Sequence, residues 1–553
     1  MKFETFKIPL LIFVAALFFY AYLFGWNTLN PTYTAWLWKG GISAQNYFGW
    51  AFFRMDPWLW PPGAIESFNI SQKTSIGLTD AIPLWAFFFK LFKFLLPDTF
   101  QYLGWFLFSN VFLTGLFAYF IAKKITDSLI LQLFFVLFLL LSPPFLFRLH
   151  WNPALSSHWL ILASFLFYLS PWRFIPWAIL IAVASLMHPY LLAMVMTILI
   201  FKLFSSKNIP FKKRLLECFL FFILSIELLY ITGYFVGGGS LEDLGFGFNQ
   251  LNLMGLLDGY LFNQPLLFFE WDLDNEEGSQ YLGFGVILLA LLAFILWLKN
   301  IKTHQSFFGK NAFSLWLCVI LLTIFALATP IRFLNTELFS VPIYDMPLLK
   351  QLSGIFRASG RFGWPLFYLL NMVIFATLFK YVSKKILIIL LSLTFIIQIV
   401  DLSPKLKFMH DTNHTYLEPL LSDEWQAIAK EGANVIVIPS SEVYQMERDN
   451  RLHITWQHYI PPAFYVAFFA YKNKMRTNYA HSSRLNLEEW HRFMNYHVKL
   501  LIEGKPAKNT IYVFFDEIPM AQLKELLPEN IFKRLIVINE YPVLPICKNC
   551  ENE

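Results

Sequence analysis

The stretch IPLLIFVAALFFYAYLFGW, residues 8–26, is apolar over about the length that a helix needs to cross a bilayer. Runs of this kind recur as far as residue 400, with short charged or Pro/Gly-rich breaks between them. The 553-residue chain is 57% hydrophobic, 19% aromatic and only 14% charged, and its mean hydropathy is +0.52. This composition excludes a soluble globular protein, a disordered chain and a small disulfide-built domain. It predicts a polytopic α-helical membrane protein.

About eleven transmembrane helices are predicted from these runs. The first, 8–26, is expected to be retained because no small-residue cleavage site follows it. The other predicted spans are 102–122, 128–147, 156–171, 174–188, 189–204, 215–236, 281–298, 313–330, 362–379 and 386–400.

The Lys and Arg residues between the spans predict their orientation. With a cytoplasmic N-terminus, every cytoplasmic loop is basic, with Lys or Arg at 123–124, 173, 207–214, 299–310 and 380–385. On the other side, the loop 236–280 has no Lys or Arg but eight Asp or Glu. The positive-inside rule therefore predicts a cytoplasmic N-terminus and, after eleven spans, an extracytoplasmic C-terminal region.

This topology requires that the segment AIPLWAFFFKLFKFLLP, 81–97, does not span the membrane. It is shorter than the roughly 20 residues of a span, and it carries two lysines, Lys90 and Lys93. We expect an interfacial helix whose lysines reach the headgroups. The segment belongs to a first outer loop, 27–101, that is longer than a connector requires, and such loops are usually functional.

Charge density separates the C-terminal region from the rest. The last 152 residues hold 35 of the 80 charged residues, and short β-branched runs at 434–441, 510–517 and 534–541 alternate with amphipathic helices. We predict a transmembrane domain over 1–401 and a soluble α/β domain over 402–553. Near the C-terminus, Cys547 and Cys550 can close a small disulfide if that end is extracytoplasmic. The net charge of +6 does not require a nucleic-acid partner.

The first outer loop contains the densest candidate motif, GWAFFRMDPWLWPPG. In it Arg54 and Asp56 lie beside Trp58 and Trp60. Aromatic rings next to one cation and one carboxylate suit a carbohydrate ring or an isoprenoid phosphate, and they also suit an interfacial tryptophan belt. Asp80 follows in TSIGLTDAIP. It either caps the interfacial helix or converges with Asp56 as general base and as metal or substrate ligand.

Two further motifs lie on the predicted outer side. RLHWNPALSSHW, 148–159, and the later SLMHPY supply His150, Asn152, His158 and His188, and ionisable residues at the ends of membrane helices face a protein interior or a cavity more often than lipid.

In GIFRASGRFGW, Arg357 and Arg361 are four residues apart. Two guanidinium groups one helical turn apart suit a phosphate, although ion pairs between loops are the alternative.

Taken in order, GWAFFRMDPWLWPPG, TDAIPL with LLPDTFQYLGW, RLHWNPALSSHW, MHPY and FRASGRFGW resemble an uncharacterised bacterial family of integral membrane proteins with a fold like that of GT-C glycosyltransferases. The resemblance covers about residues 40–370 well. It implies a bacterial inner membrane location, a periplasmic C-terminal domain, and a polyprenyl-phosphate sugar donor approached from the membrane. It also implies an acidic catalytic residue in the first outer loop. Where relatives carry an acidic residue and a histidine before GW, this chain has Ile42 and Asn46.

The resulting hypothesis is a glycosyltransferase that moves a hexosyl or pentosyl group to a glycan, lipid or protein acceptor. Asp56 or Asp80 would take the proton of the acceptor hydroxyl, while Arg357 and Arg361 would hold the departing lipid phosphate. The other substrate-binding candidates are Arg54, Trp58, Trp60, His150, Asn152, His158 and His188. A requirement for a divalent cation such as Mg or Mn is left open. The alternatives are a transporter or flippase of a lipid-linked glycan and a non-catalytic envelope assembly protein.

Overall fold

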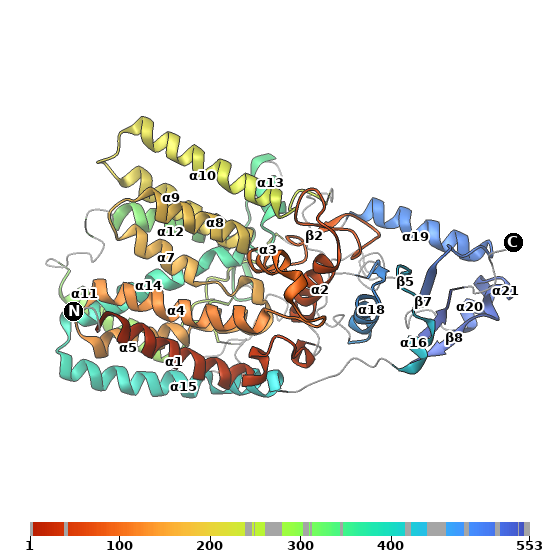
Figure 1. Ribbon diagram of the computed structural model, residues 1–553. Coiled ribbons are helices and arrows are strands. Elements are labelled where there is room, and N and C mark those ends of the chain that lie inside the picture. Colours follow the sequence, from red (N-terminus) through yellow and green to blue (C-terminus); the bar gives the residue numbers. More distant parts are fainter. Residues whose placement is uncertain are drawn as a thin grey trace. The chain divides into compact units, whose positions relative to one another are not determined.

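The computed structural model describes residues 4–37, 42–237, 246–247, 249–259, 279–301, 309, 312–342, 347–414, 422–438, 461–479, 486–514, 520–539 and 541–546. The chain forms two compact units (Figure 1). We call the first, comprising Met1–Asn30, Gly104–Ile226 and Leu241–His414, the helical unit. The second, the sheet unit, comprises Pro31–Leu103, Glu227–Ser240 and Thr415–Glu553.

The helical unit is built from the predicted apolar runs, each of which contains a helix. In chain order these helices are α1 (Glu4–Phe24), α4 (Leu103–Ile125), α5 (Leu129–Leu140), α6 (Pro143–Trp151), α7 (Trp159–Tyr168), α8 (Phe174–Met187), α9 (Pro189–Ser205), α10 (Phe211–Ile231), α11 (Phe284–Lys299), α12 (Ala312–Leu327), α14 (Trp364–Tyr381) and α15 (Lys384–His414). The shorter α13 (Pro347–Ile355) and the hairpin of β3 (Ile331–Phe333) and β4 (Thr336–Phe339) complete the unit.

Fewer helices than predicted are long enough to cross a membrane. Within the described residues, four pass by length and composition, at 7–24, 103–125, 359–381 and 384–414, and a fifth passes if α5 and α6, bent by 46°, form one span. Pro143 and Pro144 follow the break between α5 and α6 directly, and proline cannot continue the hydrogen bonds of the preceding helix. The structure therefore contains four or five candidate spans in place of the predicted eleven.

The last helix of the unit extends beyond the predicted domain boundary at residue 401. Helix α15 continues to His414, and Asp401 is buried within it. The Asp401 carboxylate accepts hydrogen bonds from Tyr281 Oη and from the backbone N–H of Phe284, both at 2.9 Å. Asp401 therefore caps the first turn of α11, and α15 continues past the residue at which the soluble region was predicted to begin.

The sheet unit contains a five-stranded sheet of order β6-β5-β7-β9-β8. Strands β5 (Asn434–Ile438), β6 (Arg476–Thr477) and β7 (Thr510–Phe514) are parallel, whereas β9 (Tyr541–Leu544) is antiparallel to β7 and to β8 (Ile536–Ile538). The accompanying helices are α16 (Asp423–Ile428), α18 (Pro461–Lys472), α19 (Leu487–Ile502), α20 (Met520–Leu526) and α21 (Glu529–Phe532). The predicted strands and amphipathic helices of the C-terminal region are thus present.

The first outer loop belongs to this same unit. It supplies α2 (Ile42–Met55), the short hairpin of β1 (Ala64–Ile65) and β2 (Thr74–Ser75), and α3 (Pro83–Leu91). Phe68 bridges to Thr477 of β6 in parallel, and two backbone hydrogen bonds of 3.0 Å flank the bridge, from Thr477 N to Ser67 O and from Ile70 N to Thr477 O. Residues 67–70 therefore cover an edge of the C-terminal sheet, which satisfies backbone groups that an open edge would expose. The sequence had grouped this loop with the transmembrane domain.

Candidate functional site

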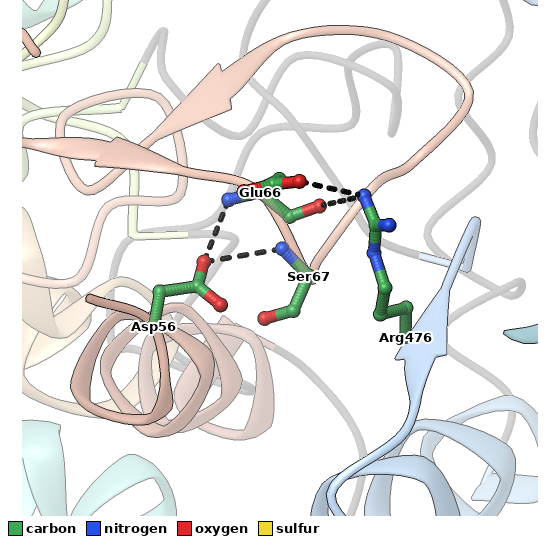
Figure 2. Close-up of polar contacts among 4 residues, drawn as sticks. All are labelled: Asp56, Glu66, Ser67 and Arg476. Atoms are coloured by element: carbon green, nitrogen blue, oxygen red, sulfur yellow. Dashed lines mark hydrogen bonds and ion pairs between the residues drawn. The ribbon is translucent and has the colours of Figure 1, made fainter. Parts of the chain in front are cut away.

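Asp56 follows the last residue of α2, and its carboxylate is engaged by the loop itself. Its Oδ2 accepts the backbone N–H groups of Glu66 at 2.6 Å and Ser67 at 3.1 Å (Figure 2). The side chain is only 6% exposed. The carboxylate thus joins the end of α2 to the segment that pairs with β6. This structural task explains Asp56 without a catalytic role.

Arg54 is also used to hold the loop together. Its guanidinium donates to the carbonyl oxygens of Pro97 at 2.7 Å and Leu96 at 3.0 Å. In the opposite direction, Lys93 Nζ donates to the carbonyl oxygens of Arg54 and Asp56, both at 3.3 Å. These bonds fasten the end of α2 to the chain that follows α3.

Helix α3 is the observed core of the predicted interfacial segment. It is nine residues long, which is too short to span a bilayer, and Phe88, Leu91, Phe94 and Leu95 on or just after it are exposed. Lys90 is only 1% exposed: its Nζ lies 3.8 Å from the ring centroid of Phe53 and donates to Pro57 O at 3.2 Å. Burial, reinforced by the charge of Lys93 and opposed by Asp56, lowers the pKa of Lys90 from 10.5 to about 7.

The two tryptophans of the motif differ in exposure. Trp58 is half exposed and stacks on Phe87 of α3, with Lys90 Nζ 4.7 Å from its ring centroid. Trp60 is 76% exposed, and its Nε1–H donates to Tyr230 Oη at 3.1 Å. Trp58 is therefore part of the packing of α3, whereas Trp60 presents most of its ring to the surroundings.

Asp80 lies in a strained turn directly before α3. Its φ is +54° and that of Ile82 is +53°, in the left-handed region that a β-branched residue such as isoleucine rarely adopts. Ile82 is the N-cap of α3, and its own side chain makes no capping bond. Left-handed non-glycine residues cost about 1–3 kcal/mol each and are concentrated at functional sites.

The turn is held by its backbone. Asn46 Nδ2 donates to Asp80 O at 2.6 Å, and Tyr102 Oη donates to Ala81 O. Gly49 of α2 allows this close approach, because a Cβ there would lie only 2.7 Å from Thr79 Cβ. Asn46, at the place where relatives carry a histidine, thus supports the backbone of Asp80. The Asp80 side chain is half-buried.

In the helical unit, His158 and Arg148 meet at Trp364. His158 is fully buried; its Nδ1 bonds to Tyr368 Oη at 2.8 Å and its ring centroid lies 4.3 Å from that of Trp364. The Arg148 guanidinium lies 5.4 Å from the Trp364 ring and 4.6 Å from the Phe147 ring. Within the described residues, His158 Nε2 has no hydrogen-bond partner.

A polar network on α4 fixes the turn that carries His158. Asn110 Nδ2 donates to Ser156 Oγ at 2.7 Å, and its Oδ1 accepts from Ser157 Oγ at 3.0 Å and from Trp159 Nε1 at 3.1 Å. Asn110 was not identified from the sequence. A buried asparagine within an apolar run is the signal that could have found it.

Tyr190 connects His188 to the arginine motif. His188 is the N-cap of α9, and its Nδ1 accepts the Tyr190 N–H at 3.2 Å. The Tyr190 ring centroid lies 4.6 Å from the Arg361 guanidinium, and its Oη accepts the Ala358 N–H at 2.9 Å. Arg357 precedes the 3₁₀ turn Ser359–Gly363 that contains Arg361, so the two arginines do not lie on one α-helical turn as predicted.

Lys405 is a further basic residue that the sequence analysis assigned to the soluble region. It is buried on α15, with Nζ 5.5 Å from the Phe147 ring and 5.1 Å from the Phe408 ring. The ring of His150 lies 5.3 Å from Phe408, and Asn152 ends α6 as a buried C-cap. Cationic side chains from α6 and α15 therefore share one aromatic surface.

The candidate residues fall into two sets. The sheet unit holds Arg54, Asp56, Trp58, Trp60 and Asp80, and the helical unit holds His150, Asn152, His158, His188, Arg357 and Arg361. Among the described residues, no group of three or more His, Cys, Asp or Glu is arranged to hold a metal ion. The predicted disulfide cysteines, Cys547 and Cys550, lie outside the described residues.

Comparison with known families identifies the chain. Residues 13–403 match the domain of unknown function DUF6311, and residues 424–545 match the DUF6311 C-terminal domain. The protein therefore belongs to the DUF6311 family. No curated protein matches the chain.

Proposed function

We propose that this DUF6311 member is a membrane glycosyltransferase that takes a sugar from a polyprenyl-phosphate donor and transfers it to an acceptor hydroxyl on the extracytoplasmic side. The Asp80 turn carries the proposal. Its half-buried carboxylate is attached to a backbone that two left-handed residues strain and that Asn46 and Tyr102 hold in place. Strain maintained by surrounding bonds is typical of a residue kept for chemistry.

The proposed reaction removes a proton from the acceptor and releases a lipid phosphate from the donor. The Asp80 carboxylate takes the proton of the acceptor hydroxyl, and the acceptor oxygen bonds to the anomeric carbon of the sugar. The bond from that carbon to the phosphate oxygen breaks, and the lipid phosphate leaves with an additional negative charge. Within the helical unit, Arg357 and Arg361, the latter beside the Tyr190 ring, are the candidate anion-binding residues.

Asp80 is preferred to Asp56 because of what the Asp56 carboxylate already does. The backbone N–H groups of Glu66 and Ser67 both donate to Asp56 Oδ2 and occupy an oxygen that a base would need. A general base must come within hydrogen-bond reach of the proton that it removes. At 6% exposure, Asp56 offers little surface to an acceptor.

We also propose that the shorter apolar helices complete the predicted eleven-span bundle, with the N-terminus cytoplasmic and the sheet unit periplasmic. Exposed apolar side chains such as Ile175 and Ile179 on α8, and Phe313 and Ile324 on α12, support lipid-facing surfaces on these helices. Alkaline phosphatase fused after residue 208 should be inactive, and the same reporter fused after residue 414 should be active. Activity of the first fusion and not of the second would contradict this topology.

Glycan profiling of cells tests the enzyme itself. In a deletion strain, the wild-type gene should restore a glycan product, whereas Asp80→Asn and Arg361→Gln should not and should let a polyprenyl-linked sugar accumulate. Asp98→Asn is the matched control, because it makes the same chemical change at an exposed position of the same loop. An unchanged glycan profile in the deletion strain, or full product with Asp80→Asn at a normal protein level, would contradict the proposed function.

A further inference from the structure

A second site lies in the helical unit at the end of α7 that is opposite His158. A cavity of about 540 Å³ opens between the end of α4, the end of α7 and the start of α8. His158 is the N-cap of α7, whereas the cavity is lined by residues 166–171 at the C-terminal end of that helix. The cavity is therefore separate from the candidate residues described above.

The polar part of the cavity is cationic. Its basic lining residues are Lys123 and Lys124 from α4 and Arg173 from the start of α8, and none of its lining residues is acidic. All three cations are exposed, and within the described part of the chain none of them forms an ion pair. Three uncompensated cations around one cavity favour a multiply hydrogen-bonding anion such as a phosphate group.

The remaining lining of the cavity is apolar and aromatic. Phe120, Leu166, Phe167 and Trp177 form most of it. Trp177 is buried and packs against Phe167 and Trp172, with ring centroids 5.7 and 6.2 Å away, so its position is fixed by the core. A free phosphate has no apolar atoms to bury against this surface, whereas the glycerol and acyl region of a lipid would cover it.

The rim of the cavity is preformed by a buried lysine. Lys202 of α9 is 5% exposed, and its Nζ donates to the carbonyl oxygens of Tyr168 and Ser170, both at 2.8 Å. These bonds satisfy carbonyl groups at the C-terminal end of α7, which no helical N–H can reach. Ser170 lines the cavity, so its wall is held in place before any ligand arrives.

We propose that this cavity binds the phosphate headgroup of an anionic phospholipid. Lys123, Lys124 and Arg173 contact the phosphate oxygens, and the apolar floor contacts the first part of the acyl chains. Basic cavities between membrane helices are suited to anionic headgroups in this way. The inference does not depend on the proposed glycosyltransferase activity.

The test uses the full-length protein in detergent and native mass spectrometry with phosphatidylglycerol, phosphatidylcholine or inorganic phosphate. The wild type should retain phosphatidylglycerol in preference to the other two. The triple variant Lys123→Gln, Lys124→Gln, Arg173→Gln should bind it about a hundredfold more weakly, since each cation near an anionic lipid contributes roughly fivefold. The variant Lys123→Arg, Lys124→Arg, Arg173→Lys should bind within a few-fold of wild type.

A matched triple variant controls for net charge. Lys212→Gln, Lys213→Gln and Lys299→Gln also remove three exposed positive charges from this unit, but none of them lines the cavity. Its phosphatidylglycerol binding should stay within about twofold of wild type. Equal loss in both glutamine variants, equal retention of phosphatidylcholine, or competition by inorganic phosphate at equal concentration would each overturn the proposal. If thermal melting shows that the triple glutamine variant of the cavity is not folded, the single variant Lys124→Glu should still weaken phosphatidylglycerol binding. Unchanged binding by Lys124→Glu would overturn the proposal.

Discussion

The two aspartates of the first outer loop are held in opposite ways. Asp56 is held by its side chain, because its carboxylate accepts two backbone N–H groups at the start of the segment that pairs with the sheet. Asp80 is held by its backbone, because Asn46 and Tyr102 bond to carbonyl oxygens of its turn and its φ is left-handed. The difference shows that the Asp56 carboxylate is part of the fold of the loop, whereas the printed contacts at Asp80 hold its backbone.

The arginines of the two units show the same contrast. The Arg54 guanidinium donates to carbonyl oxygens at the end of the interfacial segment. These hydrogen bonds hold the loop together. The Arg361 guanidinium lies 4.6 Å from the ring centroid of Tyr190, a contact that orients the group. Carbonyl contacts mark a structural arginine, and ring contacts are compatible with an arginine that binds an anion.

The largest expected difference separates Asp80→Asn from Asp56→Asn. Removing a general base should lower sugar transfer by about 10²–10⁴-fold in Asp80→Asn, with the melting temperature nearly unchanged. Asp56→Asn retains an oxygen acceptor and should keep most of the activity. Transfer by purified protein, normalised to folded protein, measures both. If Asp56→Asn lost as much activity as Asp80→Asn without loss of stability, the distinction between the two aspartates would be wrong.

The next largest effect is on stability. Asp56→Ala leaves the N–H groups of Glu66 and Ser67 without their acceptor, and the free energy of unfolding should fall by about 2–4 kcal/mol. Thermal melting and limited proteolysis of the 56–67 segment measure this loss. Asp80→Ala provides the comparison at the other aspartate of the loop, and it should melt closer to wild type because Asn46 and Tyr102 hold the turn through its backbone. Equal melting of Asp56→Ala and wild type would remove the structural role of Asp56.

The sequence predicts the elements of the fold better than their association. The apolar runs and the β-branched runs at 434–438 and 510–514 became helices and strands because those patterns are local. The pairing of 67–70 with Thr477 joins residues about 400 positions apart, and no local pattern indicates it. For the same reason Asp56 looked catalytic, since its partners are set by the hairpin and not by its neighbours. Lys405 was missed because a helix continues past Pro404.

A smaller effect should follow from closing the space between α2 and the Asp80 turn. The added methyl group of Gly49→Ala would lie 2.7 Å from Thr79 Cβ and 2.9 Å from Ala81 Cβ, and overpacking of this kind costs about 1–3 kcal/mol. We expect the turn to shift, so that sugar transfer falls while the Asp56 contacts persist. Ala51→Gly, also on α2, controls for a change in helix propensity. Unchanged activity in Gly49→Ala would show that the position of the turn is not critical.

Lys90 should make the stability of the sheet unit depend on pH, and this effect is smaller than those above. Its pKa is about 7 in the folded protein and about 10.5 when unfolded, so the unfolded chain binds more protons between these values and stability should rise with pH over that range. Below pH 7 both states are protonated and the lysine contributes no slope. Lys90→Met should flatten the rise in melting temperature between pH 7 and pH 9, whereas Lys73→Met, at an exposed position, should not. An identical slope in Lys90→Met would contradict this assignment.

The smallest effect concerns the ion pair that lies beside the Asp56 contacts. Arg476 Nη2 is 3.2 Å from Glu66 Oε1, but the two side chains are 42% and 59% exposed (Figure 2). Exposed ion pairs contribute little, so Glu66→Gln and Arg476→Gln should each change the free energy of unfolding by less than about 1 kcal/mol. Urea unfolding of both variants beside Asp56→Ala measures the difference. Glu66 would then hold this edge of the sheet mainly through the backbone N–H that it donates to Asp56. If Glu66→Gln lowered the free energy of unfolding as much as Asp56→Ala does, that role would belong to the Glu66 side chain instead.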